Sequence, residues 1–129
     1  MNDKIILVVE DESIVRRLVV RRLVQQGYTA IESEDPRQAL LQVAQLKSLD
    51  LVVTDCMMPH MSGEEMVEKI RGRFPDVPVL FMSGYPGQSA APKSDYLEKT
   101  SFNEEFLPKI YKLLGQDQAN PSPAAPLTL

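Results

Sequence analysis

The chain has 129 residues, a length typical of a single domain, and this excludes a second catalytic domain. Hydrophobic residues make up 43% and charged residues 25% of the chain, so we expect it to bury a core and fold alone. The net charge of -4 argues against a nucleic-acid surface, which requires clustered positive charge.

Cysteine usage and hydropathy set the expected compartment. The chain has one cysteine, Cys56, so an internal disulfide is excluded. No stretch has the uninterrupted apolar length of a membrane span or the pattern of a signal peptide. We therefore expect a cytoplasmic domain that makes no membrane contact of its own.

The first part of the chain predicts a strand, a helix and a second strand. Residues 4–9 form a short, continuous β-branched run, which is typical of a strand buried on both faces. Residues 13–26 supply helix formers with apolar residues at helical spacing, and Gly27 suits the position that follows a helix end. Residues 28–33 alternate loosely between apolar and polar and predict the second strand.

Capping signals mark the second helix. Asp35 is suited to the N-cap, Pro36 to the first helical position, and Gln38 completes the pattern of a capping box. Apolar residues continue at helical spacing, so the helix is expected to run to about Lys47.

The third and fourth strands flank another helix. Residues 49–54 predict the third strand, which leads into Asp55 and a turn rich in Met and Pro. A second capping box, at residues 62–65, opens an amphipathic helix. Residues 77–82 predict the fourth strand, which stops at Ser83.

The last part of the chain begins with a weak segment. Residues 85–94 hold two prolines, a glycine and two alanines, and they predict one or two helical turns at most. Residues 95–98 predict a short fifth strand, and residues 102–114 a final helix. We expect an ordered domain over residues 1–115 and a disordered, Pro-rich tail or linker over residues 116–129.

The alternation of five strands with helices predicts an α/β fold, in which a parallel sheet carries helices on both faces. Ligands of such sheets bind outside the carboxyl ends of the strands. The polar residues at these ends are Glu10, Asp11 and Glu12 after the first strand, Asp55 after the third, Ser83 after the fourth and Lys99 after the fifth.

These residue types together indicate phosphoryl transfer. Carboxylates at one edge repel each other unless a cation lies between them, and oxygen ligands without His or thiolate favour Mg²⁺ over zinc. Mg²⁺ leaves coordination open for a phosphoryl oxygen, and the Lys99 ammonium and Ser83 hydroxyl complete a cradle for the remaining oxygens. The central Asp55 is then the expected nucleophile.

Each of these residues alone has a structural explanation. Acids at residues 10–12 favour a helix N-terminus, Asp55 suits a turn, Ser83 a loop and Lys99 a solvated surface. Only their conjunction favours a functional site.

Other polar or reactive residues carry weaker signals. Cys56 is expected to pack as a small apolar residue, and His60 to lie in an exposed loop without a chemical role. Arg16, Arg17 and Arg21 share an arc of the first helix, which indicates either a solvated face or a docking site for an acidic partner.

Four motifs carry a resemblance to a known family. They are residues 6–12 (ILVVEDE), 52–63 (VVTDCMMPHMSG), 82–85 (MSGY) and 95–99 (DYLEK). In this order, within a match over residues 4–114, they resemble the receiver domain of two-component response regulators. The Ser-Gly-Tyr of the third motif is similar to receivers of hybrid sensor histidine kinases.

The resemblance implies a flavodoxin-like, doubly wound sheet of five parallel strands in the order 2-1-3-4-5. It also implies that Asp55 accepts a phosphoryl group from a phosphohistidine on a histidine kinase or a histidine phosphotransfer domain. The implied Mg²⁺ ligands are Glu10, Asp11, Asp55 and the backbone carbonyl of Met57.

The resemblance further implies a two-state switch. Lys99 would pair with the phosphate, Ser83 would swing toward it as the switch hydroxyl, and Tyr96 matches the aromatic residue that changes rotamer with it. The phosphoryl group would then bias a pre-existing conformation and alter a partner-binding surface.

The sequence departs from the family pattern at two places. Thr100 follows Lys99 where most relatives have a proline after a cis peptide bond, so the loop there is expected to be rearranged. The span from Ser83 to Lys99 is several residues shorter than usual, so the helix before the fifth strand is expected to be shortened or lost.

Two other classes of function compete with a phosphoacceptor switch. An aspartyl-phosphate phosphatase would need a second carboxylate two residues after Asp55, and that position is Met57. At most, slow self-dephosphorylation is then expected rather than enzymatic turnover. A docking module independent of phosphorylation would tolerate a degraded set of acids, whereas this set is intact. A free-standing receiver and one cut from a larger kinase or regulator both remain open.

Overall fold

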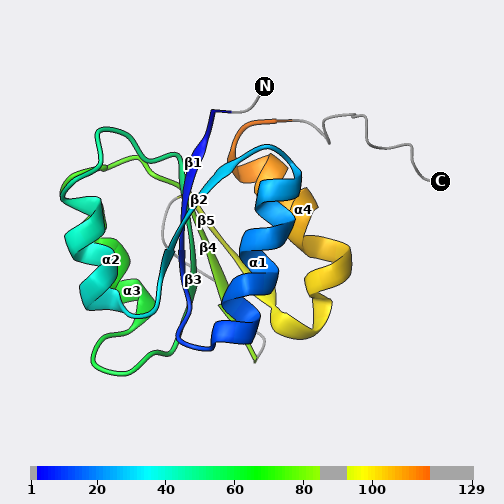
Figure 1. The fold of residues 1–129 in the computed structure, drawn as a ribbon, viewed down its shortest axis with the longest axis horizontal. Coiled ribbons are helices and arrows are strands. Elements are labelled where there is room, and N and C mark those ends of the chain that lie inside the picture. Colours follow the sequence, from blue (N-terminus) through cyan, green and yellow to red (C-terminus); the bar gives the residue numbers. More distant parts are fainter. Residues whose placement is uncertain (1–2, 85–92, 117–129) are drawn as a thin grey trace.

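The computed structural model describes residues 3–84 and 93–116. Five strands and four α-helices alternate along most of this part of the chain (Figure 1). In chain order they are β1 (Ile5–Val9), α1 (Ser13–Gln25), β2 (Thr29–Ser33), α2 (Pro36–Val43), β3 (Leu51–Asp55), α3 (Gly63–Ile70), β4 (Val79–Ser83), β5 (Ser94–Glu98), the 3₁₀ turn η1 (Lys99–Ser101) and α4 (Phe102–Leu113).

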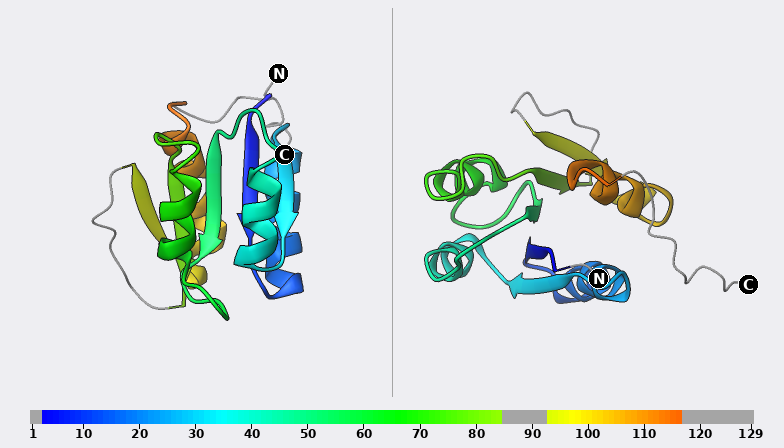
Figure 2. Two further views of the ribbon diagram at one scale, coloured as in Figure 1. Left: turned by 90° about the vertical axis from the view of Figure 1, so that its left-hand side faces the viewer. Right: turned by 90° about the horizontal axis from the view of Figure 1, so that it is seen from above.

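The strands form one parallel sheet in the order β2-β1-β3-β4-β5, as predicted. Helices α1 and α4 cover one face, and α2 and α3 cover the other (Figures 1 and 2). The central strands β1, β3 and β4 are almost fully buried because both of their faces meet helices, which explains their continuous apolar sequences.

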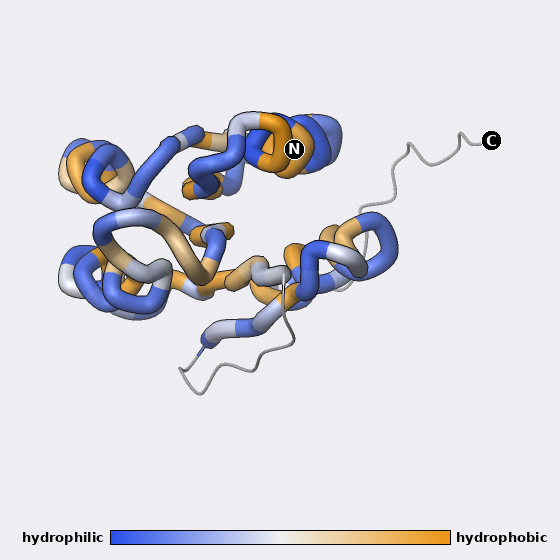
Figure 3. The backbone as a smooth tube through the Cα atoms, turned by 90° about the horizontal axis from the view of Figure 1, so that it is seen from below, coloured by the Kyte–Doolittle hydropathy of each residue, from blue (hydrophilic) through white to orange (hydrophobic). Residues whose placement is uncertain are grey.

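Two hydrophobic cores lie on the two sides of the sheet. Val19 and Leu23 of α1 and Phe106 of α4 belong to the first core, whereas Val43 of α2 and Ile70 of α3 belong to the second. Hydrophobic stretches therefore gather at the strands between the two helical layers (Figure 3). This packing fixes the sheet and aligns the carboxyl ends of its strands.

Capping residues set where several helices begin and end. The hydroxyl of Ser62 accepts the Glu65 N–H while the Glu65 side chain accepts the Ser62 N–H, so the predicted capping box of α3 is confirmed. The Asp35 side chain caps α2 by accepting the Gln38 N–H. The Gln38 side chain instead accepts the N–H of Glu34, one residue before the cap, so the second half of that predicted box is wrong.

Several predicted boundaries also differ from the structure, including that of the third strand, which spans Leu51–Asp55 rather than residues 49–54. Helix α2 ends at Val43 rather than near Lys47, because the N–H groups of Gln45 and Leu46 donate three residues back in tightened turns. Strand β4 begins at Val79 rather than at residue 77, since Pro78 has no N–H to donate to a neighbouring strand.

Two predicted segments lie wholly or largely outside the described residues. The weak helix predicted between the fourth and fifth strands falls on residues 85–92, and the tail is described only at Gln116. That residue donates its N–H to the Tyr111 carbonyl and accepts the Tyr28 hydroxyl, each at 2.7 Å. After β5, η1 leads directly into α4, and the described residues contain no cis peptide bond, so the Lys99–Thr100 peptide is trans.

Candidate functional site

The carboxyl ends of the parallel strands meet at one edge of the sheet. Glu10 follows β1, Asp55 ends β3, Ser83 ends β4 and Lys99 follows β5. The strand order places β3 between β1 and β4, so Asp55 is central at this edge. This arrangement confirms the predicted positions of these residues in the fold.

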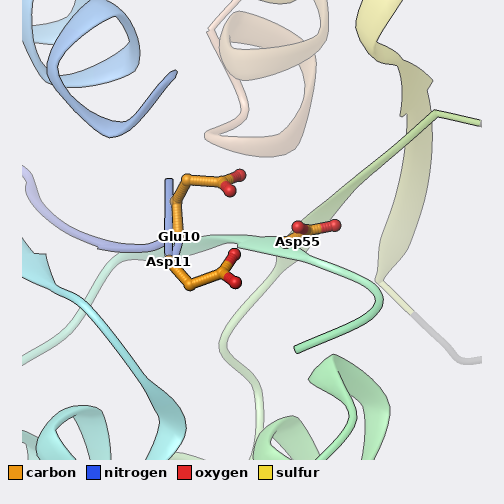
Figure 4. A group of neighbouring side chains, drawn as sticks. All are labelled: Glu10, Asp11 and Asp55. Atoms are coloured by element: carbon orange, nitrogen blue, oxygen red, sulfur yellow. The ribbon is translucent and has the colours of Figure 1, made fainter. Parts of the chain in front are cut away.

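Three carboxylates gather around a common space at this edge (Figure 4). Glu10, Asp11 and Asp55 each offer one carboxylate oxygen, and these three oxygens lie within 4.8 Å of one another. Glu10 is buried, Asp55 is partly buried and Asp11 is exposed, so the cluster opens to solvent on one side. Their hard oxygen atoms and close spacing fit a divalent cation such as Mg²⁺.

Lys99 supplies the positive charge at the cluster. Its Nζ lies 3.3 Å from Glu10 Oε1, 3.3 Å from Asp55 Oδ2 and 3.8 Å from Glu12 Oε1. Burial by itself would lower the pKa of Lys99, but Glu10 and Asp55 outweigh it and raise the pKa above its ordinary value. Lys99 is therefore a permanent cation at neutral pH.

Glu10 is a member of the cluster whose negative charge is disfavoured by its surroundings. Burial, and then the nearby negative charge of Asp55, raise the pKa of Glu10 from 4.5 to about 7, although Lys99 acts in the opposite direction. Only 2% of Glu10 is exposed, so water screens its charge poorly. A bound cation would relieve this unfavourable interaction.

The loop after β3 holds Asp55 in place. The N–H of Met57 points at the Asp55 carboxylate, with an N···Oδ1 distance of 3.4 Å. The Gly63 N–H donates to the Cys56 carbonyl at 2.9 Å. Gly63 packs so tightly that a Cβ there would overlap the Asp55 carbonyl oxygen. The start of α3 is thus seated directly on the end of the strand that carries Asp55.

Ser83 and Tyr96 lie on adjacent strands. Ser83 is paired in register with Glu98 of β5 at the carboxyl edge. Tyr96 packs its ring against Phe81 with 5.3 Å between ring centroids, and its hydroxyl donates to Glu64 Oε2 of α3 at 2.9 Å. Cys56 packs at the margin of the second core, as predicted from its type.

Sequence reasoning missed four contacts around the site. Glu12 was recognised as an acid at the strand end but not as a partner of Lys99. Arg16 donates to the Glu10 carbonyl at 2.8 Å and pairs with Glu32 at 3.2 Å, so it supports the loop after β1. The bond between Glu64 and Tyr96 joins residues 32 positions apart, and no sequence signal pointed to it.

Comparison with known proteins assigns the family. The response regulator receiver domain model matches residues 6–110, so the chain belongs to this family. Receivers are the phosphoacceptor domains of two-component phosphorelays, and the chain is therefore a signalling domain of this class.

Two relatives at more than 30% identity are histidine kinases. It is 32% identical over 126 residues to hybrid signal transduction histidine kinase D of Dictyostelium discoideum, covering 92% of this chain and 8% of that protein. It is 36% identical over 109 residues to the sensor kinase CckA of Brucella abortus, covering 84% of this chain and 11% of that protein. The chain thus spans a small fraction of these kinases.

Solved structures agree with the fold. The receiver domain of the hybrid histidine kinase CckA superposes with a TM-score of 0.76 at 31% identity, covering 85% of this chain and 98% of that one. The response regulator TrrA of Thermotoga maritima, solved in complex with Mg²⁺-BeF, superposes with a TM-score of 0.74 at 30% identity, covering 86% and 99%. The predicted resemblance is confirmed.

Two general properties of the family apply here. Receiver domains bind Mg²⁺ at an acidic pocket, and an acidic cluster of that kind is present at the strand ends. They also interact with histidine kinases or phosphotransfer proteins. In the part of the chain that the structure describes, no helix has the length and apolar character needed to span a membrane.

Proposed function

We propose that Asp55 is the phosphoacceptor of this receiver and that its donor is a phosphohistidine on a histidine kinase or phosphotransfer domain. The observation that carries the proposal is the contact of Asp55 with both a carboxylate cluster and an ammonium at the central strand end. A lone turn aspartate has neither partner.

Mg²⁺ is held, in this proposal, by Glu10, Asp11, Asp55 and the backbone carbonyl of Met57. The first three supply the clustered oxygens, and Met57 lies in the turn that folds over the Asp55 carboxylate. The complex of the Thermotoga relative with Mg²⁺-BeF supports the binding of Mg²⁺ by this domain. When bound, Mg²⁺ supplies neutralisation of the negative charge on the phosphoryl oxygens.

Asp55 and Lys99 have distinct roles in the transfer. One Asp55 carboxylate oxygen attacks phosphorus, a P–O bond forms as the P–N bond to the donor imidazole breaks, and the imidazole retains the electron pair. Lys99 lies against the acceptor carboxylate and offers its ammonium to a phosphoryl oxygen. Most of the catalytic effect is then positioning and charge stabilisation.

Ser83 and Tyr96 are the proposed switch residues. Ser83 ends the strand beside β3 and carries the hydroxyl that would turn toward the phosphoryl group. Tyr96 lies on the next strand, so a rearrangement at Ser83 is transmitted across β4 and β5. The output is a changed surface for a downstream partner.

The site supports a switch rather than an enzyme with turnover on external substrates. Met57 stands two residues after Asp55, where a phosphatase would need a carboxylate as acid and base. Slow self-dephosphorylation is the only hydrolysis that we propose. The same domain serves equally as a free-standing receiver or as the receiver of a larger cytoplasmic kinase or regulator.

Intact mass spectrometry after incubation with a small acyl-phosphate donor tests the proposal. The wild type should gain one phosphoryl group only when Mg²⁺ is present, and Asp55→Asn should gain none. Asp76→Asn is the matched control, because Asp76 is an exposed aspartate paired with Lys93 away from the cluster. Equal uptake by wild type and Asp55→Asn would overturn the assignment.

A further inference from the structure

Tyr96 is held by a residue that the proposed phosphoryl chemistry does not use. Its hydroxyl donates to Glu64 Oε2 at 2.9 Å, from β5 to the first turn of α3. The Tyr96 side chain is only partly buried, and its ring packs against Phe81 in a tilted arrangement with an interplanar angle of 32°. Ring packing fixes the base of the side chain, and the bond to Glu64 fixes its polar tip.

The bond joins β5 to α3, and each of these two elements is connected to the end of β3 through different contacts. Glu64 follows Gly63, which donates to the Cys56 carbonyl and packs on the Asp55 carbonyl. Tyr96 is linked to the same strand end through Phe81, which its ring contacts and which pairs in register with Thr54, the residue before Asp55. A displacement at the end of β3 therefore acts on both partners of the bond between Glu64 and Tyr96.

The charge on Glu64 makes the bond sensitive to the state of Asp55. Glu64 lies in the first turn of α3, directly after Gly63, and Gly63 packs on the Asp55 carbonyl. A phosphoryl group on Asp55 brings roughly two negative charges to this region, and these repel the Glu64 carboxylate. The unphosphorylated protein thus favours the bond, and phosphorylation weakens it.

We infer that Glu64 is a positioning residue that holds Tyr96 in the orientation of the unphosphorylated state and so sets how readily the domain switches. The inference rests on the proposed function of Asp55 and of Tyr96. It predicts that loss of the Glu64 carboxylate shifts the equilibrium toward the phosphorylated conformation before any phosphoryl group is added.

The test uses Mg²⁺ with beryllium fluoride as a probe that occupies the phosphoryl position. NMR shifts of the full chain are recorded for the wild type without and with the probe, which defines the direction of switching. Glu64→Ala without probe should move along this direction, and its apparent dissociation constant for beryllium fluoride should fall about fivefold, as expected for the loss of one hydrogen bond. Glu64→Gln, which keeps an acceptor oxygen, should give a smaller change.

Glu68→Ala is the matched control, because Glu68 is an exposed acid one turn further along α3. It should leave the shifts and the dissociation constant unchanged. In a Tyr96→Phe background, which lacks the hydroxyl, Glu64→Ala should have no further effect on either readout. A purely structural role of Glu64 would lower the melting temperature without moving the shifts along the switching direction.

Different outcomes separate the two proposals. If the wild type responds to the probe and Glu64→Ala matches it, the inference about Glu64 is overturned while the proposed function stands. Equal effects of Glu64→Ala and Glu68→Ala also overturn it, because general loss of acidic charge then explains the result. If the wild type neither binds the probe nor gains phosphate, the proposed function is overturned, and the inference about Glu64, which rests on it, is overturned with it.

Discussion

The ammonium of Lys99 lies 3.3 Å from Oδ2 of Asp55 and at the same distance from a carboxylate oxygen of Glu10. One cation that follows β5 therefore balances carboxylates from β1 and β3. Since β4 separates β3 from β5 in the sheet, Lys99 reaches across a whole strand to make this contact. Lys99 is thus the physical link between Asp55 and the far edge of the sheet.

Lys99→Ala should allow some phosphorylation of Asp55 but uncouple it from the conformational change. The carboxylate cluster can still hold Mg²⁺, whereas no ammonium remains to connect a phosphoryl oxygen to the end of β5. Intact mass measures phosphoryl uptake, and NMR shifts with and without donor measure the response.

Lys109→Ala is the matched control for this variant. Lys109 of α4 has the same side-chain exposure as Lys99, 25%. Its ammonium pairs with Asp95 of β5 at 3.3 Å, away from the carboxylate cluster. The control should keep both uptake and response. Full-size shift changes in phosphorylated Lys99→Ala would contradict the coupling role.

Mg²⁺ should stabilise the protein more at pH 8 than at pH 6. The folded-state pKa of Glu10 is raised from 4.5 to about 7, so its contribution to stability is present below pH 4.5 and is lost as pH rises through 7. At pH 8 the charged Glu10 of the metal-free protein costs on the order of 3 kcal/mol, which Mg²⁺ relieves.

Urea unfolding with and without Mg²⁺ at the two pH values measures this difference. Glu10→Gln removes the charge, so it should be more stable than the wild type at pH 8 without metal and should respond little to Mg²⁺. A wild type with the same Mg²⁺ stabilisation at both pH values would show that Glu10 does not govern the effect.

Gly63→Ala should destabilise the fold by about 2 kcal/mol or more, because the added Cβ would overlap the Asp55 carbonyl and force a backbone shift. Gly84→Ala is the control, since a Cβ at Gly84 meets nothing within 4 Å. Chemical denaturation compares the two variants. Equal stability of both would mean that α3 can move away from β3 at little cost.

Alkaline pH should unfold the protein partly through Tyr28. Burial, and then Tyr111, raise the pKa of Tyr28 from 10.0 to about 12, so its contribution to stability is full below pH 10 and is lost as pH rises through 12. Unfolding free energies of the wild type at pH 9, 10 and 11 should change little between pH 9 and 10 and fall between pH 10 and 11.

Tyr28→Phe should reduce this slope without abolishing it, because burial also raises the pKa of Tyr111. The variant also loses the hydrogen bond to Gln116, so it should be about 1 kcal/mol less stable at pH 7. An unchanged slope would show that Tyr28 ionises equally in the folded and unfolded states.

Local signals were sufficient for the strands and for most helix ends. Continuous apolar runs predicted β1, β3 and β4 because these strands are buried on both faces. Gly27, with a φ of 89°, ends the α1 region as expected from its freedom at positive φ. The errors at Val43 and Pro78 also had local causes, namely the tightened turns that follow Val43 and the missing N–H of Pro78.

The residues that share the site could be predicted from the sequence for a related reason. Parallel strands bring their carboxyl ends to one edge, so the alternation of elements was enough to group Glu10, Asp55, Ser83 and Lys99. The distances between the side chains of this group could not be predicted from the sequence. The contacts of Lys99 with three carboxylates depend on how the chain turns after β5, which is set by packing of η1 and α4.

The sequence by itself determined the order of elements, the edge at which chemistry occurs and the residue types available there, because periodicity and capping act over a few residues. Only the tertiary structure decided the long-range partners. The bonds of Tyr96 with Glu64 and of Tyr28 with Gln116 join residues 32 and 88 positions apart. Such partners are chosen by the packing of whole elements, and no local pattern encodes them.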